Sequence, residues 1–113
     1  MIKNLWIILL FAGALLAHPP SEIKADYNRT SHLLSITVMH DTKDVNMHHI
    51  YEISVTVNKK KRILQSIVWQ QDALYQKAVF LITDVNAGDI LEITAKCNIY
   101  GKKTVKLTIP GEN

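Results

Sequence analysis

One cysteine and five histidines are the residues of this sequence whose side chains could do chemistry. The histidines stand at positions 18, 32, 40, 48 and 49, and the cysteine stands at position 97 in the segment CNIYG. Imidazole nitrogens and a thiolate together are ligands that suit iron, copper or zinc. Their presence leads to the hypothesis of a metal site whose ligands come from distant parts of the chain.

Cys97 taken alone admits three interpretations. It is the single cysteine, so no internal disulfide can form. A free cysteine commonly behaves as a small buried hydrophobe. An odd cysteine in an exported chain can also pair with a second molecule, and a thiolate can bind a metal. The third interpretation requires partners, which directs attention to the histidines.

The N-terminal segment MIKNLWIILLFAGALLA has the features of a secretory signal. Lys3 gives a positive start, and the apolar run from Leu5 to Ala17 ends in small residues. This run is short for a membrane span and typical of a cleaved signal, with cleavage after Ala14 or Ala17. We therefore expect a signal peptide over residues 1–17 and one domain over 18–113, exported to the periplasm or the extracellular space. An uncleaved signal segment acting as a membrane anchor is the alternative.

The charge of the chain excludes one class of partner. The 113 residues carry a net charge of +3, which falls to +2 when Lys3 leaves with the signal segment. A nucleic-acid-binding domain would carry a larger and clustered basic excess. We therefore expect no nucleic-acid partner.

Alternating hydrophobic residues predict short strands along the rest of the chain. The segments 32–40, 50–58 and 90–100 alternate most clearly, and 63–71, 74–84 and 104–109 are further candidates, with a turn over Asn58–Arg62. About seven such strands with no convincing helix predict an all-β fold, an immunoglobulin-like antiparallel β-sandwich. The residues expected to face its core in the clearest segments are Leu34, Ile36, Val38, His40, Ile53, Val55, Val57, Leu91, Ile93, Ala95, Cys97 and Ile99.

The strand ends bring some of the histidines together. His40 ends one strand, and His48 and His49 close the loop that follows it. Because strand ends gather at the two poles of a sandwich, His40 and His48 must share a pole. His32 begins the same strand as His40 and is expected on the surface at the other pole. Strand order decides whether Cys97 reaches the first pole.

Three segments resemble a known metal-binding family. HPPSEI, MH followed by NMHHIYEISVTVN, and KCNIYGKKTVKLTI are similar to the iron-binding domain of desulfoferrodoxin and superoxide reductase, in the same order and over nearly all of 18–113. The resemblance implies an immunoglobulin-like fold. It also implies iron held by four equatorial histidines and an axial cysteine, with an open position at which superoxide is reduced to hydrogen peroxide.

The resemblance assigns ligands one by one. His18 matches a histidine in the N-terminal arm, His40 matches the one at a strand end, and His48 matches the one in the loop. Cys97 matches the axial cysteine. Tyr100 stands where the fourth histidine belongs, and a phenol is a poor ligand for ferrous iron because of its high pKa.

Two further features depart from the family. His49 replaces a tyrosine of the family, so that His49 and Tyr100 are secondary ligand candidates. Leu15, Leu16 and Ala17 precede His18, where the family has a lysine near the open position of the iron. The resemblance therefore implies a site that lacks this cation.

The sequence thus supports three functional hypotheses. The first is one-electron reduction of superoxide at a histidine- and cysteine-ligated iron, which is reduced again by an unidentified electron donor. The second is copper binding by His18 as a new N-terminus after cleavage, completed by His40, His48 or Met47. The third is an immunoglobulin-like binding domain without metal, in which Trp69, Tyr51 and Tyr75 form either an exposed patch or part of the core.

Overall fold

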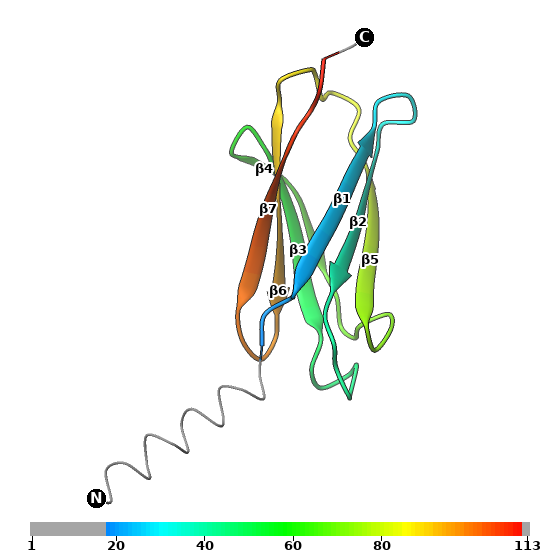
Figure 1. Cartoon of the computed structure of the whole chain (residues 1–113), viewed down its shortest axis with the longest axis vertical. Coiled ribbons are helices and arrows are strands. Elements are labelled where there is room, and N and C mark those ends of the chain that lie inside the picture. Colours follow the sequence, from blue (N-terminus) through cyan, green and yellow to red (C-terminus); the bar gives the residue numbers. More distant parts are fainter. Residues whose placement is uncertain (1–17, 112–113) are drawn as a thin grey trace, which may run out of the picture.

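The protein folds into seven antiparallel strands in two facing sheets (Figure 1), as seen in a computed structural model that describes residues 18–111. The expected all-β sandwich is confirmed. The predicted signal peptide, 1–17, lies outside the described residues. Within the described part no helix is long and apolar enough to cross a membrane. The strands are β1 (Glu22–Asn28), β2 (Leu33–Met39), β3 (Ile50–Val57), β4 (Lys60–Ser66), β5 (Tyr75–Leu81), β6 (Ile90–Cys97) and β7 (Lys102–Thr108).

The strand order places three connections and the N-terminal arm at one end of the sandwich. One sheet has the order β1-β2-β5 and the other β4-β3-β6-β7, so the chain changes sheets after β2, β4 and β5. The arm before β1, the β2–β3 and β4–β5 loops and the β6–β7 turn all lie at the lower end in Figure 1. We call this end the arm pole. Residues far apart in the sequence meet there.

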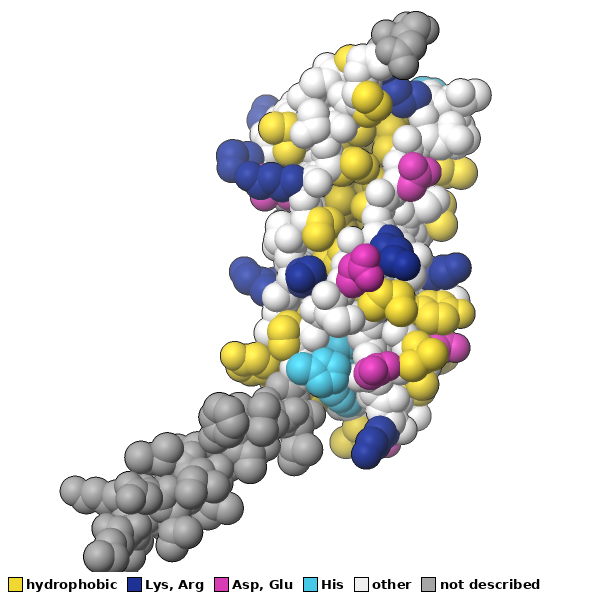
Figure 2. Space-filling view, in the orientation of Figure 1, with side chains coloured by type: hydrophobic (Ala, Val, Ile, Leu, Met, Phe, Trp, Pro, Cys, Tyr) yellow, Lys and Arg dark blue, Asp and Glu magenta, His cyan; other side chains and the backbone are white. Residues whose placement is uncertain are grey.

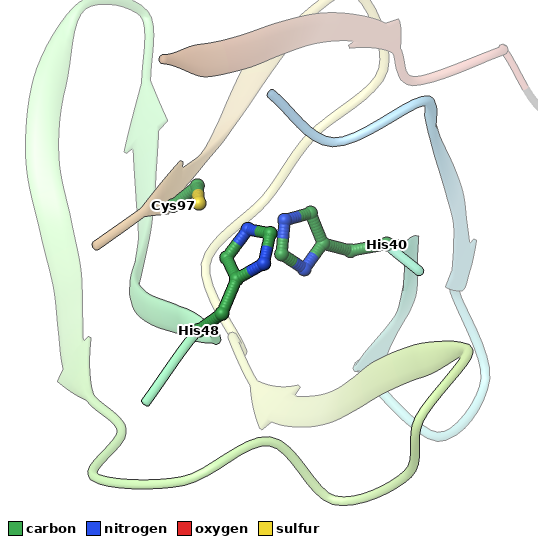
Figure 3. A group of neighbouring side chains, drawn as sticks. All are labelled: His40, His48 and Cys97. Carbon is green, nitrogen blue, oxygen red and sulfur yellow. The ribbon is translucent and has the colours of Figure 1, made fainter. Parts of the chain in front are cut away.

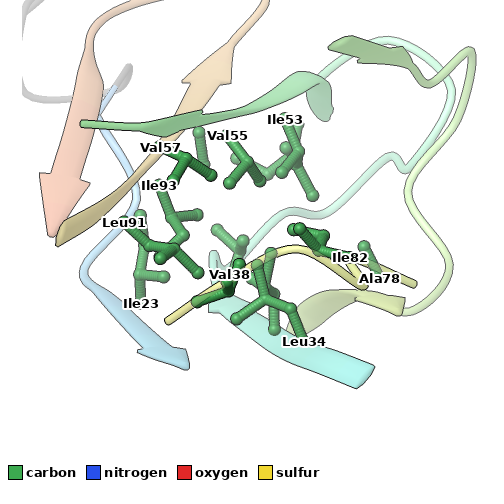
Figure 4. Close-up of a cluster of buried hydrophobic side chains, with 14 of the residues drawn as sticks. Ile23, Leu34, Val38, Ile53, Val55, Val57, Ala78, Ile82, Leu91 and Ile93 are labelled. Atoms are coloured by element: carbon green, nitrogen blue, oxygen red, sulfur yellow. The ribbon is translucent and has the colours of Figure 1, made fainter. Parts of the chain in front are cut away.

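The core lies between the sheets and follows the predicted alternation (Figure 4). Every second residue of β2 and β6, and of β3 from Ile53 onward, is buried, because successive side chains of a strand point to opposite faces. All the residues predicted to face inward are buried except Ile99. Further buried residues of the core are Ile23, Ile50, Ala78, Ile82, Val85 and Ile109.

Two strand boundaries differ from the prediction around β4. The turn predicted over Asn58–Arg62 shortens to Asn58 and Lys59, whose φ angles of 49° and 72° suit a two-residue hairpin turn. The strand predicted over 63–71 is displaced toward this turn, so β4 ends at Ser66. The chain leaves the ladder because Gln70 is buried and uses its side chain to bond backbone groups of other loops.

The prediction also fails at the end of β6. The sequence predicts that the alternation continues to Ile99. In the structure β6 ends at Cys97, and Ile99 is 55% exposed. A tight turn begins here, closed by the N–H of Cys97 donating to the carbonyl of Gly101 at 3.0 Å. Because the backbone bends before Ile99, strand alternation no longer determines on which side of the sheet the side chain of Ile99 lies.

Ile93→Ala should destabilise the sandwich by about 2–5 kcal/mol, because Ile93 is fully buried and its truncation leaves a cavity. Ile90→Ala, in the same strand but exposed, is the matched control and should cost less than about 1 kcal/mol. Urea unfolding of the two variants measures the difference. Equal losses would contradict the core described above.

Candidate metal centre

Strand pairing brings Cys97 to the arm pole. In the ladder between β3 and β6, Ile50 pairs with Cys97. His48 and His49 immediately precede Ile50, so the end of β6 lies beside the end of the β2–β3 loop. Figure 2 shows histidine side chains gathered at this end of the molecule. The pairing therefore answers the question of strand order that the sequence left open.

His40, His48 and Cys97 form a cluster of metal-ligating side chains (Figure 3). One ligand atom from each, a ring nitrogen or the sulfur, lies within 4.8 Å of the other two. Ligands 2.0–2.3 Å from a shared metal are separated by roughly 3.3–4.4 Å. Side-chain shifts of a few tenths of an ångström would therefore bring all three onto one ion. This group could hold a metal.

Two nitrogens of this cluster lack a partner of their own. Nε2 of His40 and Nε2 of His48 are buried and make no hydrogen bond with any of the described residues, 18–111. His40 is 1% exposed, and Cys97 is also buried. Because buried polar atoms are nearly always bonded, two orphaned nitrogens in one cluster with a thiol require an explanation. Metal coordination would satisfy both nitrogens.

His18 lies beside the same cluster. Its ring centroid is 5.1 Å from that of His40 and 5.5 Å from that of His48, and the latter two are 4.8 Å apart. Imidazoles that share one metal through nitrogens 2.0–2.1 Å away have ring centroids about 5 Å apart. Nδ1 of His18 donates to the carbonyl of Pro19 at 3.1 Å, which leaves Nε2 as the nitrogen with a lone pair.

Gln70 fixes the orientation and tautomer of His40. Its Oε1 accepts hydrogen bonds from Nδ1 of His40 at 2.8 Å and from the N–H of Ile50 at 3.1 Å. Its Nε2 donates to the carbonyls of His40 at 2.7 Å and Asp72 at 2.8 Å. With its proton on Nδ1, His40 presents the lone pair of Nε2 to the cluster, as second-shell partners of metal ligands do. Sequence patterns did not indicate this role, because Gln70 lies in a segment predicted to be a strand.

Asn98 ties the two ligand-bearing segments together. Its Oδ1 accepts from the N–H of His49 at 2.7 Å, its Nδ2 donates to the carbonyl of Met47 at 3.0 Å, and its own N–H donates to the carbonyl of His49. The N–H of Ile99 donates to Sγ of Cys97 at 3.4 Å. This contact helps to hold the sulfur in place at the end of β6.

The remaining candidates occupy other places. His49 is buried next to the cluster but outside the group of three, and its Nδ1 has no partner. Tyr100 is 57% exposed, so its phenol lies in solvent and not among the buried ligands. His32 is half-buried near Tyr27 at the opposite pole. Met47, considered as a copper ligand, is 70% exposed.

The environment keeps the imidazoles of the cluster neutral. Burial is the main cause that lowers the pKa of both His40 and His48, and the neighbouring histidine rings lower it further. The hydrogen bond that Nδ1 of His40 donates to Gln70 partly offsets this effect on the pKa of His40. A lower pKa keeps the ring nitrogens unprotonated near neutral pH, which is the state required of a ligand.

A cavity of about 480 Å³ connects the cluster to solvent. His18 and His48 form part of its wall, and the rest is lined by Asp41, Thr42, Lys43, Asp44, Ala73 and Leu74. Lys43 is a cation near the site that the sequence analysis did not identify. The cation comes from the β2–β3 loop and not from the arm, and two carboxylates share the wall with it.

Comparison of the chain with protein-family models, with curated proteins and with solved structures found no match. The function must therefore be inferred from the geometry of the cluster and its surroundings.

The metal-free protein should lose stability as the pH falls below about 6.5, the pKa of an unfolded histidine. The pKa values of His40 and His48 are lowered in the folded state. At mildly acidic pH the unfolded chain therefore binds more protons than the folded chain. The contribution of the two neutral histidines to the free energy of unfolding is complete above about pH 6.5. It is lost as the pH falls toward the pKa values of these histidines in the folded state. Urea midpoints between pH 7.5 and 5 would measure this loss, which should shrink in a His40→Gln, His48→Gln double variant. An unchanged dependence in that variant would contradict the assignment.

Proposed function

We propose that this protein binds one iron ion through His18, His40, His48 and Cys97 and reduces superoxide there. The observation that carries the proposal is the pair of buried, unpartnered Nε2 atoms that lie with the thiol of Cys97 beside a solvent-connected cavity. The resemblance of the surrounding segments to superoxide reductases supports iron as the metal. Reduction of superoxide follows from that resemblance.

The donor set leaves room for a reactant. Three imidazoles and one thiolate supply four ligands, and the exposure of Tyr100 supports a site with three histidines instead of four. Iron commonly accepts five or six ligands, so at least one position would stay free. The cavity wall formed by His18 and His48 places that position within reach of small molecules from solvent.

The chemistry requires one electron and two protons for each superoxide, which becomes hydrogen peroxide. Ferrous iron in this site would supply the electron, becoming ferric, and an external donor would restore it. Gln70 holds His40 in its ligating tautomer, and the N–H of Ile99 positions the sulfur of Cys97. Water in the cavity would supply the protons.

Lys43 has a role in bringing the anion to the site. Superoxide is negatively charged, and a lysine on a cavity wall raises the local concentration of anions. Asp41 and Asp44 on the same wall oppose this attraction. We therefore expect Lys43 to increase the rate at which superoxide reaches the site, but only modestly.

Copper is the second candidate, and a specific observation favours it. His40, His48 and Cys97 alone form a two-histidine, one-cysteine set, which is the donor set of blue-copper electron-transfer sites. Such sites carry a weak axial ligand, and Met47, which directly precedes His48, is exposed. In this alternative the protein transfers electrons and does not reduce superoxide.

Loading the purified protein anaerobically with ferrous iron and then oxidising it should produce a thiolate-to-iron absorption band in the red region. The band should disappear in Cys97→Ser, because the sulfur is its source. Visible spectra and iron content after desalting measure both effects. His32→Gln, at the opposite pole, is the matched histidine control and should keep the band.

Two other results would contradict the iron proposal. An intense blue colour with cupric ion, together with no retained iron, would favour the copper site. No retention of either metal would leave a metal-free binding domain, for which the exposed Trp69 gives a starting point for mutagenesis.

Lys43→Ala should lower the rate constant for superoxide reduction roughly threefold to tenfold at low ionic strength, because the nearest cation of the cavity is lost. Its iron content should not change, since Lys43 is not a ligand. Pulse radiolysis gives the rate. Lys60→Ala, at the start of β4 and the far end of the sandwich, is the control. If both variants react at the same rate, Lys43 has no such role.

A further inference from the structure

The arm that carries His18 rests on the β6–β7 turn. A Cβ atom built on Gly101 would lie 2.8 Å from Cβ of Pro19 and 3.3 Å from its Cα. The first distance is shorter than side-chain atoms tolerate, so Pro19 occupies the space that a side chain at position 101 would need. At its other end the arm is fixed by the N–H of Ser21, which donates to the carbonyl of Met39 at 2.9 Å.

The same turn also holds Cys97. The carbonyl of Gly101 accepts the N–H of Cys97 at 3.0 Å, and Gly101 has a φ of +80°, which favours glycine. Gly101 therefore touches the segment of one proposed ligand and bonds the backbone of another. The distance between His18 and Cys97 depends on how closely Pro19 can approach this turn.

We propose that Gly101 is a positioning residue for His18: its lack of a side chain seats Pro19 against the turn and thereby brings the imidazole of His18 to the metal. This inference rests on the proposed function, specifically on His18 as a ligand. A side chain at position 101 would push Pro19 away by about 1 Å to reach ordinary van der Waals separation. Metal–ligand distances tolerate only about 0.2 Å, so His18 would leave the site.

Gly88 provides a matched control for the backbone. Its φ is +88°, close to that of Gly101, and a Cβ atom built on it meets no atom within 4 Å. Alanine at position 88 therefore carries a similar conformational penalty without the collision. A difference between Gly101→Ala and Gly88→Ala isolates the contact with Pro19.

The test is a titration of the full chain with Co²⁺, whose visible bands report the number and type of ligands. Gly101→Ala should bind Co²⁺ about tenfold more weakly, with altered bands, as expected for a disturbed support of a ligand. Gly88→Ala should match the wild type. In a His18→Ala background the Gly101→Ala change should have no further effect, because it acts through His18.

The outcomes separate this inference from the proposed function. If His18→Ala weakens binding but Gly101→Ala equals Gly88→Ala, the positioning role is overturned and the metal site stands. If His18→Ala binds Co²⁺ as the wild type does, the ligand role of His18 fails and this inference with it. Should Gly101→Ala not fold, Pro19→Gly tests the same contact from the other side. It should also weaken binding about tenfold, and wild-type affinity would overturn the proposal.

Discussion

The pairing of Ile50 with Cys97 is the constraint on which the candidate site depends. A ladder between β3 and β6 fixes which residues of the two strands lie opposite each other. A shift by one residue would turn Cys97 away from the core, because side chains alternate between the faces of a sheet. The buried residues of both strands, among them Ile53 and Ile93, make that shift costly. The hydrophobic core thus sets the register from Ile53 onward, and the register shift between Ile50 and Glu52 then places Ile50 opposite Cys97.

Around this pairing, buried or partly buried amide side chains join the loops of the arm pole by hydrogen bonds. Gln70 uses four hydrogen bonds to join the end of β2, the start of β3 and the β4–β5 loop. Asn98 joins the β2–β3 loop to the end of β6. Buried amides of this kind are tolerated only when they are satisfied, so they rigidify the pole. The nitrogens left without partners stand out against this background, and that contrast is what points to a metal.

The surroundings of the cluster connect its structure to its chemistry. Burial keeps the imidazoles of His40 and His48 neutral, the N–H of Ile99 holds the sulfur of Cys97 in place, and the cavity admits small molecules. These three conditions are needed for a metal site that reacts with a solute. The cavity wall carries charges of both signs, from Lys43 and the two aspartates. A wall that only attracts anions would carry positive charges alone.

The sequence by itself determined the strands, the faces of most core residues and the common pole of His40 and His48. Alternation is a local property, and two residues that flank one loop are close in any fold. The sequence did not determine the end of β6 or the course of 67–74, because a tight turn at Gly101 and the buried side chain of Gln70 override local patterns. The resemblance to superoxide reductases named His18, His40, His48 and Cys97 as partners. Only the tertiary structure brought Cys97 beside His48, and His18 beside His40 and His48, since strand order and the packing of Pro19 on Gly101 depend on residues distant in the chain.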